Sequence, residues 1–172
     1  MPHLALAAIG HDRPGLVAAV AEVLVRHDAN VEDSQMAVLR GHFAMTLVVA
    51  APDGAEPALR SDLEAVAARL GLEAISLNPV ADDAGARPVA THVVRVHGAD
   101  HPGILAAVTA ALAAREVNVC DLQTRLLSGD ELYVMLIEVA VPEGADVEGP
   151  LAAVAEEQAV RITVSELDQD AL

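Results

Sequence analysis

The chain is short of several residue types, and each shortage excludes a class of protein. Its 172 residues include no Lys or Trp, one Phe, one Tyr and one cysteine, Cys120, which excludes an internal disulfide. With so few aromatic rings, the core has to be built from aliphatic side chains. No apolar run reaches the roughly 18 to 20 residues of a membrane-spanning helix, and the first residues lack the basic segment of a secretory signal. We therefore expect a cytoplasmic protein that does not associate with membranes.

Positive charge is also scarce. The ten basic residues are all Arg, and they stand against 26 Asp and Glu, which gives a formal net charge of -16. A chain with this charge repels polyphosphates and anionic membrane surfaces. The composition argues against direct nucleic-acid binding, so we expect any effect on transcription to act through a partner protein.

A short motif with Gly and Pro occurs twice, 88 residues apart. Gly10-His11-Asp12-Arg13-Pro14-Gly15 returns as Gly98-Ala99-Asp100-His101-Pro102-Gly103. Each copy follows an apolar, strand-like run and precedes an apolar, helix-like run, where the first N–H groups of a helix lack internal partners. We interpret Asp12 or Arg13 as the helix cap, Pro14 as a first-turn residue and Gly15 as an opening for a ligand. A plain turn would explain one copy, but two copies in matching contexts favour an anion-binding loop.

The pattern of apolar residues around the motif is duplicated as well. Strands are expected at 3–9, 31–39, 42–50 and 72–78, with helices from 16 to about 29 and from 57 to 70. The order starts again at residue 91 and ends with a helix at 150–158, a strand at 160–166 and a loose acidic tail. Residues 133–135 match 43–45 at an offset of 90, which predicts a hairpin longer by two residues. We predict domains at 1–80 and 89–168, joined by a linker at 81–88.

This order predicts an α+β fold with two ferredoxin-like βαββαβ repeats. Each repeat should form a four-stranded antiparallel sheet with both helices on one face and its second strand at an edge. Because an edge strand has unpaired backbone groups, residues 31–39 can pair with 119–127. We therefore expect the repeats to lie side by side in one eight-stranded antiparallel sheet.

The element order, the Asp-x-Pro-Gly loops and the Asn-Val pairs that open the next strands resemble the ACT domain, a small regulatory fold that binds amino acids. The resemblance covers almost the whole chain twice, as in stand-alone tandem ACT proteins of the glycine cleavage system transcriptional repressor family. It implies ligand sites where paired domains meet. Carried onto this sequence, the implied ligand-binding residues are Asp12, Arg13, Pro14, Gly15, Leu16, Asn30 and Val31 in one site and Asp100, His101, Pro102, Gly103, Ile104, Asn118 and Val119 in the other.

Three further sets of residues are candidates for binding, metal ligation or catalysis. Gln35 and Gln123 occupy matching positions and can reach a ligand side chain, although a solvated edge strand explains them as well. Seven His suggest the pairs His3 with His11 and His97 with His101 as metal ligands, but no metal-binding spacing accompanies them. Scattered surface His are the favoured interpretation, so we expect no metal and no cofactor. Nothing surrounds Cys120 in a nucleophilic pattern, and we expect no catalysis.

Three functional hypotheses remain open. The first is a regulatory protein that binds an amino acid between its repeats and signals through a protein partner. The second is an interaction module, self-pairing or enzyme-binding, that has lost its ligand pocket. The third is a detached regulatory part of an enzyme. A homodimer is compatible with each of them.

Overall fold

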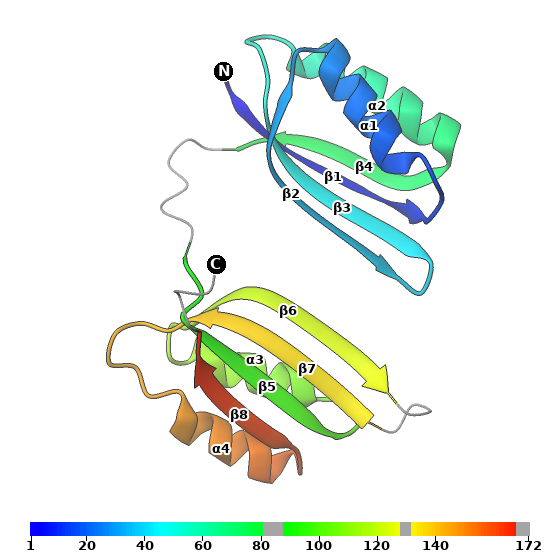
Figure 1. The fold of residues 1–172 in the computed structure, drawn as a ribbon. Coiled ribbons are helices and arrows are strands. Elements are labelled where there is room, and N and C mark those ends of the chain that lie inside the picture. The colour runs from blue at the N-terminus through cyan, green and yellow to red at the C-terminus, as the bar shows by residue number, and fades with distance from the viewer. Residues whose placement is uncertain (81–87, 128–131, 168–172) are drawn as a thin grey trace. The chain divides into compact units, whose positions relative to one another are not determined.

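The computed structural model describes residues 1–80, 88–127 and 132–167. The chain divides into two compact units, Met1–Gly85 and Ala86–Leu172, and Figure 1 shows the elements of each. The elements of the first unit are β1 (His3–His11), α1 (Leu16–Arg26), β2 (Asn30–Leu39), β3 (His42–Ala50), α2 (Glu56–Leu70) and β4 (Leu72–Pro79). Those of the second unit are β5 (His92–Ala99), α3 (Ile104–Ala113), β6 (Asn118–Leu127), β7 (Leu132–Ala140), α4 (Glu148–Glu157) and β8 (Arg161–Glu166). The predicted order of elements is confirmed in both halves, whereas 81–87 of the predicted linker and the predicted tail lie outside the described residues.

Each unit contains one four-stranded sheet. The strand orders are β2-β3-β1-β4 and β6-β7-β5-β8, and all neighbouring strands are antiparallel. In each unit both helices cover the same face of the sheet (Figure 1). This is the predicted ferredoxin-like topology, with β2 and β6 at sheet edges. The side-by-side pairing of the two sheets stays a prediction.

Strand register reproduces the duplication residue by residue. Gly10 lies opposite Phe43 in the first sheet and Gly98 opposite Tyr133 in the second, so the offsets are 88 on β5 and 90 on β7. The β6–β7 hairpin is therefore two residues longer, as predicted. Its turn, residues 128–131, lies outside the described part of the chain.

An aliphatic core lies between the sheet and the helices of each unit. β1 contributes Leu4 and Leu6 and α1 contributes Val20 and Leu24, all nearly inaccessible to solvent. Phe43 is the one buried aromatic ring in the described residues, and no polar or charged side chain among them is buried. None of the helices in the described ranges is long and apolar enough to cross a membrane.

The helix boundaries correct several predicted ones. Asn30 does not end α1, because the helix ends at Arg26 and the left-handed residue after it is Asp28, with φ of 53°. Asn30 instead opens β2. The last helix, α4, begins at Glu148, two residues before the predicted start at Pro150.

A left-handed residue follows the second helix in both units. It is Gly71 after α2, with φ of 65°, and Ala159 after α4, with φ of 50°. The surrounding hydrogen bonds match: Gly71 N–H donates to Ala68 O and Ala159 N–H to Glu156 O, both at 3.3 Å. The two units therefore place different residue types in the same left-handed conformation, which is strained for Ala159 and not for Gly71.

We predict that Ala159→Gly stabilises the second unit by up to about 1 kcal/mol, because glycine adopts this conformation without the steric cost of a Cβ atom. Gly71→Ala should destabilise the first unit by a similar amount. Urea denaturation of both variants measures the two changes. The two changes in the free energy of unfolding should be similar in size and opposite in sign. A destabilising Ala159→Gly would contradict the left-handed conformation of Ala159.

Candidate functional site

The two predicted loops end in left-handed glycines. Gly15 has φ of 94° and Gly103 has φ of 108°, and each is the N-cap of the helix that follows. No side chain caps either helix. The predicted cap residues, Asp12 or Arg13, and the predicted first-turn position of Pro14 are therefore wrong, since α1 begins only at Leu16.

These helix starts leave backbone N–H groups available to a ligand. The first intrahelical bond of α1 runs from Ala19 N–H to Gly15 O at 2.9 Å, and that of α3 from Ala107 N–H to Gly103 O at 2.9 Å. The three N–H groups that precede each bond have no partner within the helix. A Cβ atom built on Gly15 would meet nothing within 4 Å, so the space in front of this loop is open. Uncapped N–H groups and the positive end of a helix dipole favour a bound carboxylate.

Leu16 and Ile104 have a different role from the predicted one. Both side chains are buried in the core of their unit. Only their backbone groups belong to the candidate site, while their side chains fix the first turn of each helix to the sheet.

The cationic residue of each loop is bonded within its own unit. Arg13 donates from its guanidinium to Leu70 O, at the C-terminal end of α2. His101 Nε2 lies 2.8 Å from Gln158 O, at the C-terminal end of α4, and its Nδ1 lies 3.2 Å from Pro102 O. Cations suit the negative end of a helix dipole. These side chains hold the loop against the second helix, a role that the sequence did not reveal.

The bonding of His101 sets its protonation. Both ring nitrogens face carbonyl oxygens, which only accept hydrogen bonds, so the ring with two N–H groups fits best. The hydrogen bonds to Gln158 O and Pro102 O raise the pKa of His101 above its ordinary value of 6.5. Desolvation lowers it by less than these bonds raise it, and the charge of Asp100 adds a still smaller rise. The corresponding Arg13 bond does not depend on pH, because arginine stays charged.

The Asn-Val pairs lie far from the loops of their own repeat. Asn30 lies opposite Ala50 at one end of the first sheet, whereas His11, just before the loop, lies opposite His42 at the other end. Asn118 lies opposite Ala140 and Ala99 opposite Leu132 in the same way. Because β1 and β2 start at the same end of the sheet, grouping Asn30 and Val31 with Asp12 in one site is wrong within a single repeat.

The two Gln residues lie on the face of each sheet that the helices leave uncovered. Gln35 lies opposite the exposed Thr46, while the neighbouring Met45 points into the core. Gln123 lies opposite Leu136 and its amide donates to Asp121 Oδ2 at 3.1 Å. Neither side chain is directed toward the helix starts, although both lie on the exposed edge strands.

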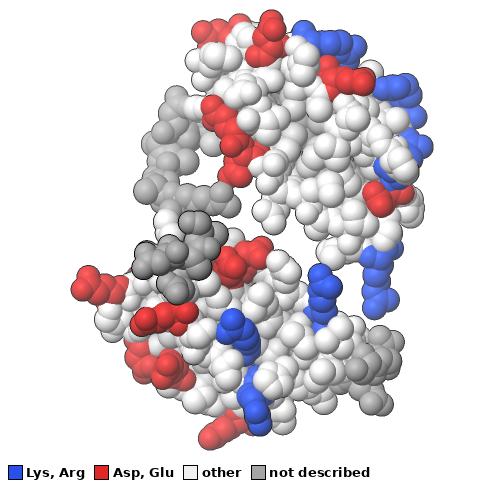
Figure 2. Space-filling model, in the orientation of Figure 1, with Lys and Arg blue, Asp and Glu red and all other residues white. Residues whose placement is uncertain are grey.

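The outer faces of the two sheets differ in charge. A hollow of about 500 Å³ on the second sheet has Arg95, His97 and Arg125 in its lining. Figure 2 shows arginine side chains on this unit among acidic ones, so the two signs are interspersed. The corresponding positions of the first sheet include Ala7, Ile9 and Ala37. The repeats are therefore not chemically equivalent.

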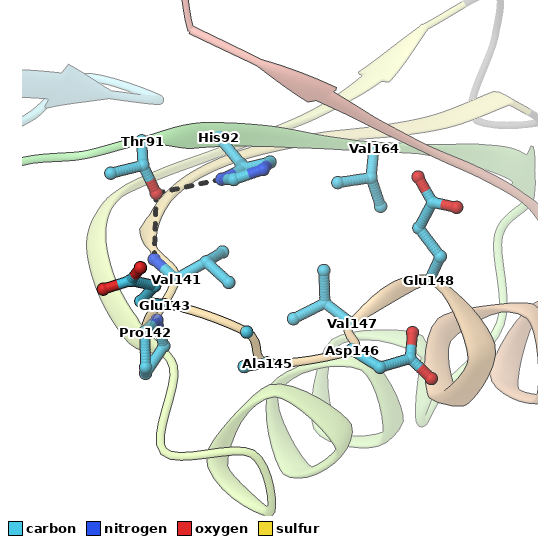
Figure 3. Close-up of a pocket in the computed structure, with 11 residues that line it drawn as sticks. Thr91, His92, Val141, Pro142, Glu143, Ala145, Asp146, Val147, Glu148 and Val164 are labelled. Carbon is cyan, nitrogen blue, oxygen red and sulfur yellow. Dashed lines mark hydrogen bonds between the residues drawn. The ribbon is translucent and has the colours of Figure 1, made fainter.

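A further cavity of about 420 Å³ lies at the start of β5, at the opposite end of the second sheet from Gly103. Thr91 Oγ1 accepts a hydrogen bond from Val141 N–H at 3.0 Å and lies 2.9 Å from His92 Nδ1. Figure 3 shows Val147 and Val164 pointing toward each other across the cavity. Sequence reasoning singled out none of these residues, because no motif or fixed spacing marks them.

Comparison with known proteins assigns the family. The model of the ACT domain matches residues 3–75 and again residues 90–165. The chain belongs to the ACT domain family. It contains two ACT repeats, and ACT domains are regulatory modules that bind small molecules such as amino acids.

The similar proteins differ in size. The chain is 39% identical over 77 residues to a UPF0237 protein of Methanopyrus kandleri, covering 44% of this chain and 86% of that protein. It is 24% identical to the glycine cleavage system transcriptional repressor of Escherichia coli, over 96% of this chain and 86% of that protein. A phosphoserine phosphatase of Streptomyces coelicolor is 31% identical over 92% of this chain, which spans only 38% of the phosphatase. A solved structure of an unknown protein from Galdieria sulphuraria superimposes with a TM-score of 0.82 at 31% identity, covering 97% of this chain and 99% of that one.

The His101 contact predicts a pH-dependent stability of the second repeat. Because the folded pKa is raised, the stabilisation is complete below pH 6.5 and is lost as pH rises through the folded pKa. Unfolding measured at pH 5.5 and pH 8.5 should show a larger difference between the natural chain and His101→Gln at the lower pH. His101→Arg should remove this pH dependence, as Arg13 does in the first repeat. A His101 pKa at or below 6.5 by NMR would contradict the assignment.

Proposed function

We propose that the protein is a non-catalytic regulator that binds a free amino acid at its β1–α1 and β5–α3 loops and signals through a protein partner. The observation that carries the proposal is the pair of uncapped helix starts behind left-handed glycines, with open space in front of Gly15. Membership of the ACT domain family supports the ligand class.

The loops offer complementary groups to both charges of an amino acid. The free N–H groups at the start of α1 suit the α-carboxylate, and the exposed Asp12 carboxylate beside them suits the α-ammonium. Asp100 and the start of α3 repeat this arrangement. Arg13 and His101 act indirectly, because their bonds to the second helix hold each loop in place.

The Asn-Val pairs enter the proposed site from a second ACT domain. Suppose that two sheets pair antiparallel, with β2 of one beside β6 of the other. The end of each sheet that carries its β–α loop then lies beside the end of the other sheet where the edge strand starts. The loop of the first repeat then meets Asn118 and Val119, and the loop of the second meets Asn30 and Val31. The second domain is the other repeat or a repeat of a second copy of the chain.

The edge strands support this pairing. All ten residues of β2 are exposed, and its side chains Met36 and Val38 lie beside the buried Met45 and Phe43 on the side that carries the helices. Val119 and Leu122 on β6 are also exposed. An exposed edge strand with apolar side chains is a template for another strand. The proposed eight-stranded sheet would cover both edges.

The names of the similar proteins suggest two settings for such a regulator. One is transcriptional regulation of glycine cleavage, and the other is regulation of an attached phosphoserine phosphatase. Glycine and serine are therefore the first amino acids to test. An interaction module without a ligand is the second candidate, favoured by the same exposed apolar edges.

Amino-acid binding is tested by thermal shift with the twenty amino acids. A ligand at 100 times its dissociation constant adds about 2.7 kcal/mol to the free energy of unfolding. Gly15→Ala should abolish binding at the first loop, because the added Cβ atom points into the open space that the ligand needs. Gly54→Ala is the matched control, since Gly54 also has a positive φ (78°) and open space around it. No shift with any amino acid would leave the interaction module.

The proposed pairing is tested by hydrogen exchange. The N–H groups of β2 and β6 that do not bond to β3 and β7 should exchange slowly if a second sheet covers these edges, because their hydrogen bonds must open first. Val38→Lys should accelerate their exchange without unfolding β3. Rapid exchange of these groups in the natural chain would exclude the pairing.

A further inference from the structure

Three side chains from three adjacent strands meet at one end of the first sheet. His11 is the last residue of β1 and lies directly opposite His42, the first residue of β3. Glu73 comes from β4, which pairs with the other side of β1. The β1–β4 register shifts between Ile9 and Gly10, next to this point. Sequence reasoning missed the group, because its successive members are 31 residues apart along the chain and only the sheet brings them together.

The candidate ligand atoms of the three side chains lie close to one another. His11 Nε2 lies 3.7 Å and His42 Nε2 3.8 Å from the same atom, Glu73 Oε1. The two imidazole rings are tilted by 40° with centroids 4.8 Å apart. In the described residues this is the one group of three or more His, Cys, Asp or Glu whose ligand atoms all lie within 4.8 Å of one another.

These distances are close to those of a metal centre. Bonds of about 2.0 to 2.1 Å in a tetrahedral zinc site place neighbouring ligand atoms about 3.3 to 3.4 Å apart. The two His–Glu distances would therefore have to shorten by about 0.4 Å. The two imidazole nitrogens, which lie within 4.8 Å of each other, would have to reach the same spacing. All three side chains are exposed, so small rotations about their side-chain bonds achieve this without moving the strands.

We propose that His11, His42 and Glu73 bind one divalent transition-metal ion of the zinc class. Two neutral imidazoles and one carboxylate suit Zn²⁺, Co²⁺ or Ni²⁺, whereas Mg²⁺ and Ca²⁺ prefer oxygen ligands alone. Three protein ligands leave one tetrahedral position open, which the exposure of the group makes available to water. The proposed metal site adjoins the first amino-acid loop, because His11 directly precedes Asp12, but it uses other groups than those proposed to bind the amino acid.

The second repeat lacks the corresponding ligands. Ala99 lies opposite Leu132 where His11 lies opposite His42. β5 pairs His97 with Arg161 where β1 pairs Ile9 with Ala74, so Glu73 is the extra residue at the β1–β4 register shift and has no counterpart in the second sheet. The fold thus forms without this group, and the second sheet serves as an internal control for it.

Hydrogen bonds join three connecting segments next to the proposed site: the β1–α1 loop, the β2–β3 turn and the end of α2. Asp12 N–H donates to Gly41 O at 2.8 Å, which joins the β1–α1 loop to the β2–β3 turn. Arg13 joins the same loop to the end of α2, next to β4. A metal ion on His11, His42 and Glu73 would connect the same segments through side chains, so binding should stabilise the first repeat selectively.

The proposal is tested by titrating Zn²⁺ into the full-length chain, without an affinity tag and after treatment with a chelator, and following heat by calorimetry. One ion per chain is expected. His42→Ala and Glu73→Gln should each weaken binding by on the order of 100-fold, more than the loss of a group outside the first coordination shell. His97→Ala, which removes an exposed His from the second sheet, should leave the affinity unchanged.

An NMR measurement separates a metal site from simple pairing of protonated His with Glu. In NMR spectra, Zn²⁺ should perturb the imidazole signals of His11 and His42 together and leave that of His97 in place. No binding by the natural chain, or binding that survives both His42→Ala and Glu73→Gln, would overturn the proposal.

Discussion

The left-handed glycine between the first strand and the first helix is the constraint on which each repeat depends. At φ near 100° it turns the chain from the sheet onto the helix layer and serves as the N-cap without a side chain. Two consequences follow from the same residue. Leu16 and Ile104 enter the core immediately after it, and the first N–H groups of each helix stay uncapped. A buried side chain and uncapped N–H groups are thus adjacent along the backbone.

A second interaction secures this turn in both repeats. Arg13 and His101 carry their charge to the carbonyl end of the second helix, 57 residues further along in each case. The contact links the two helical crossovers of a repeat to each other. The same backbone arrangement is therefore held by a permanent cation in one repeat and by a titratable one in the other.

The repeats share a fold and differ in surface chemistry. Their cores match in position and are aliphatic, so selection for packing alone would keep them alike. Their outer sheet faces differ: the first carries His11, His42 and Glu73 at one end, and the second carries arginines. Because outward-facing side chains of a strand do not affect the core, each sheet was free to acquire its own chemistry.

The sequence by itself determined the duplication, the order of elements and the ferredoxin-like class, because the apolar spacing of strands and helices is a local property. It did not determine which residue caps α1, since the sequence favoured Asp12 or Arg13 and only the backbone dihedral angles identify Gly15. Only the tertiary structure placed Asn30 at the far end of the sheet from Asp12. It alone brought His42 and Glu73 to His11, because strand register joins residues whose separation along the chain carries no signal.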